Sequence, residues 1–324
     1  MSAEGAALGA RLRERDLSAA PAALNLLEST APADREQAAA LLREVSPASL
    51  GGEAAAHVIG VTGPPGAGKS TLLSALLHAW REGADEPEGG ARTVAMLAVD
   101  PSSRHSGGSL LGDRARIDFD PADGGVLIRS TAAGERLGGL ARATRAAAQA
   151  LAAAFDIVVI ETIGVGQAET EVADVADTVA VVVQPGAGDV LQFLKSGIME
   201  IPDVLVVTKA DLGQIAAATG RDLSAALRSL GSSSTPVIAV CSLPPPSGIG
   251  ELVAALDEHR AGLDLAARRL SARRAGALSD FALEHGERGL RALGGRRAAQ
   301  ALLDAQEPGM EVPALVAALE RSMQ

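Results

Sequence analysis

The chain has 324 residues, of which 47% are hydrophobic and only 2% aromatic, so we expect an aliphatic core in one or two domains. Its net charge of -11 argues against a nucleic-acid partner, which would need a basic face. No apolar run approaches the ~18 residues of a membrane span, and no signal peptide is evident. The single cysteine, Cys241, excludes an internal disulfide and a multi-cysteine metal site. We therefore expect a cytoplasmic protein that contacts neither nucleic acid nor membrane.

The first 50 residues are expected to form a helical N-terminal extension. Leucines from Leu12 to Leu27 would anchor it, and the segment 36–45 is rich in strong helix formers. Pro32 and Pro47 interrupt the helical pattern. Gly51-Gly52 marks a boundary, after which we place a second domain at residues 51–260.

The motif around which this domain is organised matches G-x-x-x-x-G-K-[ST], the phosphate-binding loop or P-loop. It reads Gly63-Pro64-Pro65-Gly66-Ala67-Gly68-Lys69-Ser70-Thr71. A β-branched run precedes it and a leucine-rich run follows it, so it joins a strand to a helix, as the motif requires. The glycines would let backbone N–H groups cradle phosphates, aided by the helix dipole. Lys69 would reach the β- and γ-phosphates, and the Ser70 hydroxyl would bind Mg²⁺.

From residue 57 to 240, apolar strands alternate with helices. The runs at 157–160 and 179–183 show no polar alternation, as in strands that helices cover on both faces. The pattern predicts an α/β fold with a doubly wound, mostly parallel sheet and a ligand at the carboxyl ends of its strands. We expect the strands at 57–62, 94–99, 126–130, 157–161, 179–183, 204–208 and 237–241.

Two carboxylates that follow strands are candidate magnesium ligands. Asp100 follows the strand at 94–99, where a carboxylate suits water-mediated Mg²⁺ binding; a turn cap is the alternative. Glu161 opens Glu161-Thr162-Ile163-Gly164, where P-loop GTPases place D-x-x-G. The glycine-rich stretch 106–114 is a candidate switch that orders around a γ-phosphate, with an ordinary flexible loop as the alternative. Residues 165–169 continue from Glu161-Thr162-Ile163-Gly164 as a second expected switch. Gln167, in the second, is a candidate to orient the attacking water.

Two later motifs predict a guanine site. Thr208-Lys209-Ala210-Asp211 fits N-K-x-D with Thr for Asn: the aspartate would accept from guanine N1–H and the exocyclic amine, and the lysine stem would cover the base. Adenine lacks that donor pattern. Ser242-Leu243-Pro244 stands where GTPases have S-A-x, whose backbone N–H groups reach guanine O6. Leu243 and the prolines at 244–246 depart from that pattern.

Lysine is scarce: the chain has 29 lysines and arginines together, yet only three are lysines. Lys69 and Lys209 fall in nucleotide motifs, and the third is Lys195. Because arginine serves nearly everywhere else, we expect Lys195 to act where a compact, mobile ammonium is needed. Our hypothesis is that it couples a bound partner to the GTP site; the alternative is a solvated surface lysine.

Residues 261–324 are expected to form a C-terminal helical arm that mediates dimerisation. Arginines alternate there with apolar residues, and so much leucine outside the sheet favours packing on a neighbour, most simply a second copy. A solvated helical tail is the alternative. The apolar residues are Leu263, Leu265, Leu270, Leu278, Phe281, Leu283, Leu290 and Leu293.

Taken together, these motifs closely resemble the MeaB/ArgK family of cobalamin-associated P-loop GTPases, within the SIMIBI class. The stretches ETIGVGQAE (161–169) and QPGAGDVLQFLKSGIMEIPDV (184–204) are typical of this family rather than of GTPases in general. The helical ends resemble its N-terminal extension and its dimerisation arm. The remaining matches are GPPGAGKST (63–71), AVDPSS (98–103), SGGSLLGDRARI (106–117), LIRSTAAGERLGGLA (127–141) and TKADL (208–212).

The resemblance implies a GTP-hydrolysing chaperone that gates adenosylcobalamin loading and protects an acyl-CoA mutase of the methylmalonyl-CoA mutase type. Its ligands would be GTP or GDP and Mg²⁺, and Asp100, Asp113 and Glu161 would serve Mg²⁺ and switching. Residues 184–200 match a third switch that couples the partner to hydrolysis. An adenosyltransferase is a further candidate partner.

Two other classes stay open. A small-molecule kinase could use the same P-loop but would not need T-K-x-D. A nickel-delivery GTPase of the same class usually carries Cys and His ligands, and Cys241 with five scattered histidines offers no such cluster. An association of the family with arginine transport is a third, weaker option.

Overall fold

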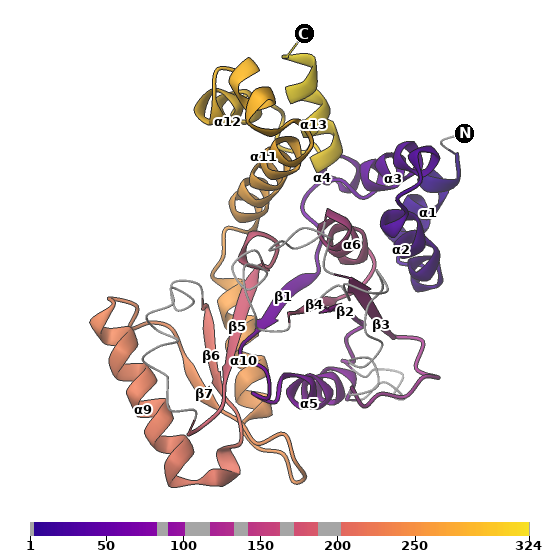
Figure 1. Ribbon diagram of the computed structural model, residues 1–324. Coiled ribbons are helices and arrows are strands. Elements are labelled where there is room, and N and C mark those ends of the chain that lie inside the picture. Colours follow the sequence, from indigo (N-terminus) through magenta and orange to yellow (C-terminus); the bar gives the residue numbers. More distant parts are fainter. Residues whose placement is uncertain are drawn as a thin grey trace, which may run out of the picture. The chain divides into compact units, whose positions relative to one another are not determined.

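The computed structural model describes residues 3–82, 90–100, 117–132, 142–162, 172–186 and 202–323, with the backbone alone at Asp100 and Ala132 (Figure 1). The chain divides into two compact units. One, the sheet unit, comprises residues 57–144 and 155–263. The other, the helical unit, comprises residues 1–56, 145–154 and 264–324. The domain boundaries expected at 50/51 and 260/261 stay a prediction.

The sheet unit is built on seven strands in the order β3-β2-β4-β1-β5-β6-β7, and every pairing is parallel. β1 lies between β4 and β5, so the chain winds away from it in both directions. The predicted doubly wound α/β fold is therefore confirmed. The strands are β1 (His57–Thr62), β2 (Val94–Asp100), β3 (Val126–Ala132), β4 (Ile157–Thr162), β5 (Thr178–Val183), β6 (Val204–Val207) and β7 (Val237–Ala239).

Burial explains why the strands could be predicted. Every residue of β1, β4, β5 and β6 is buried, as expected of strands covered on both faces. The prediction for β7 was two residues too long at its end. Cys241 leaves the sheet there and exchanges two backbone hydrogen bonds with Ser247, of 3.0 and 2.9 Å, which closes a hairpin loop.

Two helices cover one face of the sheet unit. α5 (Lys69–Arg81) and α10 (Ile249–Ala261) contribute Leu72, Leu76 and Leu252 to a cluster that also holds strand residues such as Ile59. α9 (Gln214–Ser229) packs beside β6 and β7 (Figure 1). A short helix, η3 (Val172–Asp174), precedes β5, and another, η5 (Ala210–Leu212), follows β6. This packed core of helices and strands positions the loops at the carboxyl ends of the strands.

The helices expected at the N-terminus are present in the helical unit. They are α1 (Ala3–Arg13), η1 (Leu17–Ala19), α2 (Ala20–Glu28), α3 (Pro32–Glu44) and α4 (Pro47–Leu50). α1 and α3 pack unusually closely, because a Cβ at Gly9 would lie 2.6 Å from Leu41 O. Most residues of α6 (Arg142–Ala152) belong to this unit as well.

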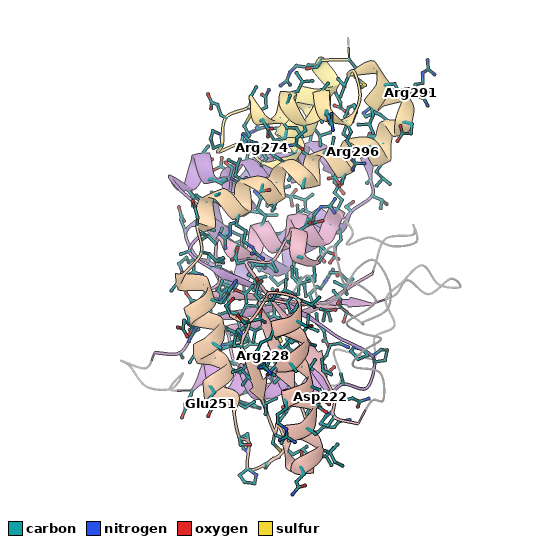
Figure 2. The ribbon with its side chains drawn as sticks, turned by 90° about the vertical axis from the view of Figure 1, so that its left-hand side faces the viewer. Asp222, Arg228, Glu251, Arg274, Arg291 and Arg296 are labelled. Atoms are coloured by element: carbon teal, nitrogen blue, oxygen red, sulfur yellow. The ribbon has the colours of Figure 1, made fainter. Side chains whose placement is uncertain are left out.

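The C-terminal residues form three helices with a core of their own, α11 (Leu265–Ala292), α12 (Arg296–Asp304) and α13 (Val312–Arg321). Leu278, Phe281, Leu290 and Leu293 are buried in it with residues of the other two helices. Arginines project from the ribbon of α11 and α12, among them Arg291 (Figure 2). The leucine content therefore largely reflects packing inside the chain, and the homodimer stays a prediction.

Among the described helices, none combines the length and the apolar character that crossing a membrane requires.

Candidate functional site

The predicted P-loop joins β1 to α5 at the carboxyl edge of the sheet. Gly63 leaves β1 with φ 141°, and a Cβ there would lie 2.1 Å from Val182 O in β5. Gly66 and Gly68 also have positive φ, of 78° and 90°. Gly68 is the N-cap of α5, so the loop curls over the positive end of that helix. This is the backbone shape that binds phosphate at a helix N-terminus.

Lys69 folds back into this loop. Its side chain is buried, and Nζ donates to Gly63 O at 2.7 Å and to Pro64 O at 3.2 Å. Phosphate oxygens would be stronger acceptors for an ammonium group than these neutral carbonyls. The position therefore fits the role predicted for Lys69.

Ser70 and Glu161 meet beside the loop, as their candidate roles require. The Ser70 hydroxyl donates to Glu161 Oε1 at 3.2 Å, and Glu161 is only 7% exposed. The parallel pairing of Val61 with Glu161 sets this approach, and a buried bond of 2.9 Å from Thr162 Oγ1 to Thr62 Oγ1 fixes the ends of both strands. A hydroxyl and a carboxylate are hard oxygen donors, so the pair fits Mg²⁺.

Thr208 connects the predicted guanine motif to the P-loop. Its buried hydroxyl donates to Ala67 O at 2.6 Å and lies 3.3 Å from Val183 O. A threonine therefore suffices to fix the motif to the loop where the pattern has asparagine.

The rest of the guanine motif follows directly. Lys209 has a left-handed backbone, with φ 54° and ψ 44°, and its exposed Nζ donates to Gln184 Oε1 at 2.6 Å and to Gly66 O at 3.3 Å. Asp211 lies exposed in η5. Gln184, the first residue after β5, was predicted only as part of the switch segment 184–200 and not as a contact of the guanine motif, although β5 pairs with β6.

Ser242, Leu243 and Pro244 lie in the hairpin loop that Cys241 and Ser247 close. A backbone hydrogen bond of 3.0 Å from Ala210 N to Val240 O brings this loop next to the guanine motif. Leu243 is 59% exposed, so it is not part of the core. The structure thus gathers all three predicted nucleotide-binding segments at one edge of the sheet.

Four predicted residues are not located by the structure. Asp113, Gln167 and Lys195 lie outside the described residues. Asp100 ends β2 with its backbone paired to Ala132, but its side chain is not described. Their roles stay predictions.

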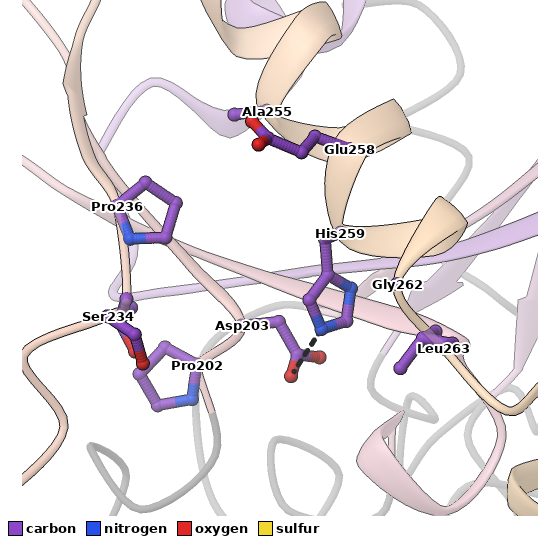
Figure 3. A pocket seen from close by; sticks show the side chains of 10 residues that line it. Pro202, Asp203, Ser234, Pro236, Ala255, Glu258, His259, Gly262 and Leu263 are labelled. Carbon is purple, nitrogen blue, oxygen red and sulfur yellow. Dashed lines mark ion pairs between the residues drawn. The ribbon is translucent and has the colours of Figure 1, made fainter.

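A separate pocket of about 480 Å³ lies at the amino ends of β6 and β7 and the C-terminal end of α10 (Figure 3). His259 Nε2 lies 3.1 Å from Asp203 Oδ1 in its wall. Since the strands are parallel, this is the sheet edge opposite the P-loop, so the pocket is not the nucleotide site. The other lining residues are Pro202, Ser234, Thr235, Pro236, Ala255, Glu258, Gly262 and Leu263.

Comparison with known proteins agrees with this site. A family model described as "Methylmalonyl Co-A mutase-associated GTPase MeaB" matches residues 20–285. The chain belongs to the MeaB family of GTPases. The predicted family resemblance and the predicted GTPase activity are thus confirmed, and the family is one associated with methylmalonyl-CoA mutase.

Proteins from bacteria, archaea and animals are similar to this chain in sequence. A Mycobacterium tuberculosis protein named "Probable GTPase" is 40% identical over 260 residues, 78% of this chain and 74% of the relative. A Pyrococcus abyssi protein, also named as a GTPase, is 40% identical over 273 residues, 82% of this chain and 78% of the relative. The "Methylmalonic aciduria type A homolog, mitochondrial" of Caenorhabditis elegans is 38% identical over 201 residues, which are 60% of this chain and 49% of that relative.

A solved structure shares the fold. The crystal structure of a LAO/AO transport system kinase matches 98% of this chain and 97% of that chain, with a TM-score of 0.63 and 26% sequence identity.

Proposed function

We propose that this MeaB-family GTPase is a chaperone for an adenosylcobalamin-dependent acyl-CoA mutase of the methylmalonyl-CoA mutase type. It would gate loading of the cofactor and protect the mutase against inactivation. The observation that carries the proposal is the family match over residues 20–285, whose description names that mutase. The name of the nematode relative, a methylmalonic aciduria type A homolog, points to the same metabolism.

The nucleotide site supports a guanine nucleotide with magnesium. Residues 63–71 would hold the phosphates, while Thr208, Lys209 and Asp211, with the loop 242–244, would hold the base. Ser70 and Glu161 would bind Mg²⁺, with Asp100 and Asp113 as further candidate ligands. A bound Mg²⁺ would neutralise charge on the β- and γ-phosphates.

We propose that the segments between these motifs couple partner binding to GTP hydrolysis. Asp113 and Gln167 would act in switches that respond to the γ-phosphate, and Lys195 in 184–200 would transmit partner binding. Lys195→Ala should leave intrinsic GTP binding nearly unchanged and abolish hydrolysis stimulated by the mutase. If the mutase stimulates hydrolysis by the variant as fully as by wild type, Lys195 has no coupling role and is a surface lysine.

A comparison of GTP turnover with ATP turnover tests whether the site selects guanine over adenine. We expect kcat/KM for GTP to exceed that for ATP, and Asp211→Ala to weaken GTP selectively, because the guanine donors lose their acceptor. Release of free phosphate with water as the acceptor separates a GTPase from a small-molecule kinase. Equal kcat/KM values for the two nucleotides would reject the guanine assignment.

The chaperone role is tested by transfer of adenosylcobalamin into the apo-mutase. Transfer should depend on hydrolysis, so a non-hydrolysable GTP analogue should retain the mutase complex and block loading. A pull-down from native lysate with that analogue identifies the mutase and shows whether an adenosyltransferase joins it. Loading that is equally fast without the GTPase would contradict the role.

We also propose that residues 261–324 mediate a homodimer in the cytoplasm. Leu283 of α11 is 54% exposed, and its apolar side chain could contact a second copy. Light scattering at micromolar concentration tests the dimer, and a monomeric intact chain would reject it.

A further inference from the structure

Lys209 adopts a conformation that its surroundings must stabilise. Within the described residues, only Lys209 and Arg15 have positive φ without being glycine. A left-handed backbone is unfavourable for a residue with a Cβ, and such strain is concentrated at functional sites. The lysine is also exposed, so its long stem has many conformations to lose on nucleotide binding. Something must therefore fix its side chain.

Two neutral oxygens hold the ammonium. Nζ donates to Gln184 Oε1 at 2.6 Å and to Gly66 O at 3.3 Å, so the stem is stretched between the loop after β5 and the P-loop. The Gln184 bond is much the shorter of the two. No carboxylate in the described part of the chain forms an ion pair with Lys209, so the positive charge of the ammonium is not neutralised.

The sheet places Gln184 for this contact. Val183 pairs with Val207 in the parallel register of β5 and β6, so the next residues, Gln184 and Thr208-Lys209, leave the sheet side by side. A 3.0 Å bond from Thr208 N to Val183 O maintains that alignment. Gln184 itself is half-buried, which limits the conformations of its amide.

We propose that Gln184 is a positioning residue for guanine-nucleotide binding, which holds Lys209 extended over the site of the base. The inference deepens the guanine role proposed for Thr208–Asp211. By fixing the ammonium before the nucleotide arrives, Gln184 lowers the conformational entropy lost on binding. An amide oxygen is suited to this because it binds the ammonium without cancelling its charge.

A double-mutant cycle on the full-length protein tests the inference with fluorescent GDP as the probe. Gln184→Met keeps the length of the side chain but removes the amide, and should weaken GDP binding about fivefold, the effect of losing one typical hydrogen bond. Lys209→Met should weaken it at least as much. The double variant should bind GDP no more weakly than Lys209→Met, because Gln184 acts only through Lys209.

Two further variants separate positioning from damage to the fold. Gln184→Glu keeps an oxygen acceptor that fixes the ammonium, although it neutralises the charge, so it should bind GDP more tightly than Gln184→Met. Gln214→Met makes the same exchange at an exposed glutamine of α9 and should leave GDP affinity unchanged. A fivefold loss with Gln184→Met that persists in the Lys209→Met background would overturn the inference, since a structural defect would add to the loss of the lysine.

The outcomes also separate this inference from the proposed base site. If Lys209→Met weakens GDP and Gln184→Met does not, the base site stands and the role of Gln184 is wrong. If Lys209→Met leaves GDP affinity unchanged, the assignment of the base to Lys209 fails, and the role of Gln184 fails with it.

Discussion

Thr208 stands where the guanine motif of GTPases has asparagine, and its hydroxyl makes the contact that joins the motif to the P-loop. The 2.6 Å bond to Ala67 O is buried. Thr208→Val keeps the shape but leaves that carbonyl without its donor, which should cost about 1–2 kcal/mol of unfolding free energy. GDP should bind several-fold more weakly, because two parts of the site lose their link. Urea unfolding and GDP titration measure both effects.

Thr208→Ser is the matched rescue, since it retains the hydroxyl. Thr235→Val, in the loop before β7 at the other edge of the sheet, is the control for the same exchange. If Thr208→Val binds GDP as tightly as wild type, the hydroxyl does not support the site.

Because His57 is buried, we expect the folded protein to lose stability in mild acid. It is 3% exposed, and its Nε2 lies 2.7 Å from Thr178 Oγ1. Burial lowers its pKa from 6.5 to about 4, aided by Arg260 and His259 and opposed by Asp177 and Asp257. The unfolded chain therefore takes up a proton at a pH where the folded chain does not. The stabilisation is complete above pH 6.5 and is lost as the pH falls towards 4.

Urea unfolding at pH 7.5 and pH 5 should reveal this linkage. From the difference between the two pKa values, His57 should contribute a loss of about 2 kcal/mol at pH 5. His57→Gln should reduce the loss by that amount. The same pH dependence in His57→Gln and wild type would exclude His57 as its source.

At the scale of the element, Gly63 allows β1 to continue into the P-loop. A Cβ there would lie 2.1 Å from Val182 O, a backbone atom of the central sheet that cannot move aside. Gly63→Ala should therefore displace the loop, cost at least about 2 kcal/mol and reduce GDP affinity strongly. Thermal unfolding with and without GDP measures both effects.

Gly231→Ala is the matched control for that change. Gly231 also has positive φ, 79°, but a Cβ there would meet nothing within 4 Å. It should cost only about 1 kcal/mol and leave GDP affinity unchanged. Equal effects of the two variants would mean that backbone conformation, and not the contact with β5, constrains Gly63.

The strands could be predicted because burial on both faces leaves a continuous apolar run, and the prediction for β1 matched at both ends. The P-loop and the guanine motif could be placed because each follows such a strand. The contact of Gln184 with Lys209 could not be predicted, since it depends on β5 lying beside β6. A sequence pattern shows that a helix has an apolar face, but it does not show which surface that face packs against. For that reason the leucines of α11 were assigned to a second copy, although Leu278 and Leu290 pack within the chain.

At the scale of the whole chain, its two ends belong to one unit. Arg269 donates to Ala54 O and Ala56 O, each at 2.7 Å, and Arg273 binds both carboxylate oxygens of Glu53. α11 is thus joined to residues that lie more than 200 positions earlier in the sequence. Such contacts give the helical unit a stability that neither end supplies alone, because each arginine satisfies groups on the other segment.

The ion pair between Arg145 of α6 and Asp280 of α11 is a further buried connection within the helical unit. The exposed fractions of the two side chains are 19% and 3%. Removing one member of a buried pair leaves a charge that water cannot solvate well. Asp280→Ala should therefore lower the unfolding free energy by about 3 kcal/mol, measured by urea unfolding of the full-length protein.

Asp304→Ala provides the matched comparison in the same unit. Asp304 pairs with Arg274 at 3.3 Å, but its side chain is 53% exposed, so water screens the interaction. Its loss should cost no more than about 1 kcal/mol. Replacing both members of the buried pair, with Arg145→Met and Asp280→Leu together, should recover much of the stability lost in Asp280→Ala, because neither charge of the pair is then left buried without the other. If the two aspartate variants unfold at the same urea concentration, the buried Arg145–Asp280 pair stabilises the helical unit no more than the exposed Arg274–Asp304 pair does.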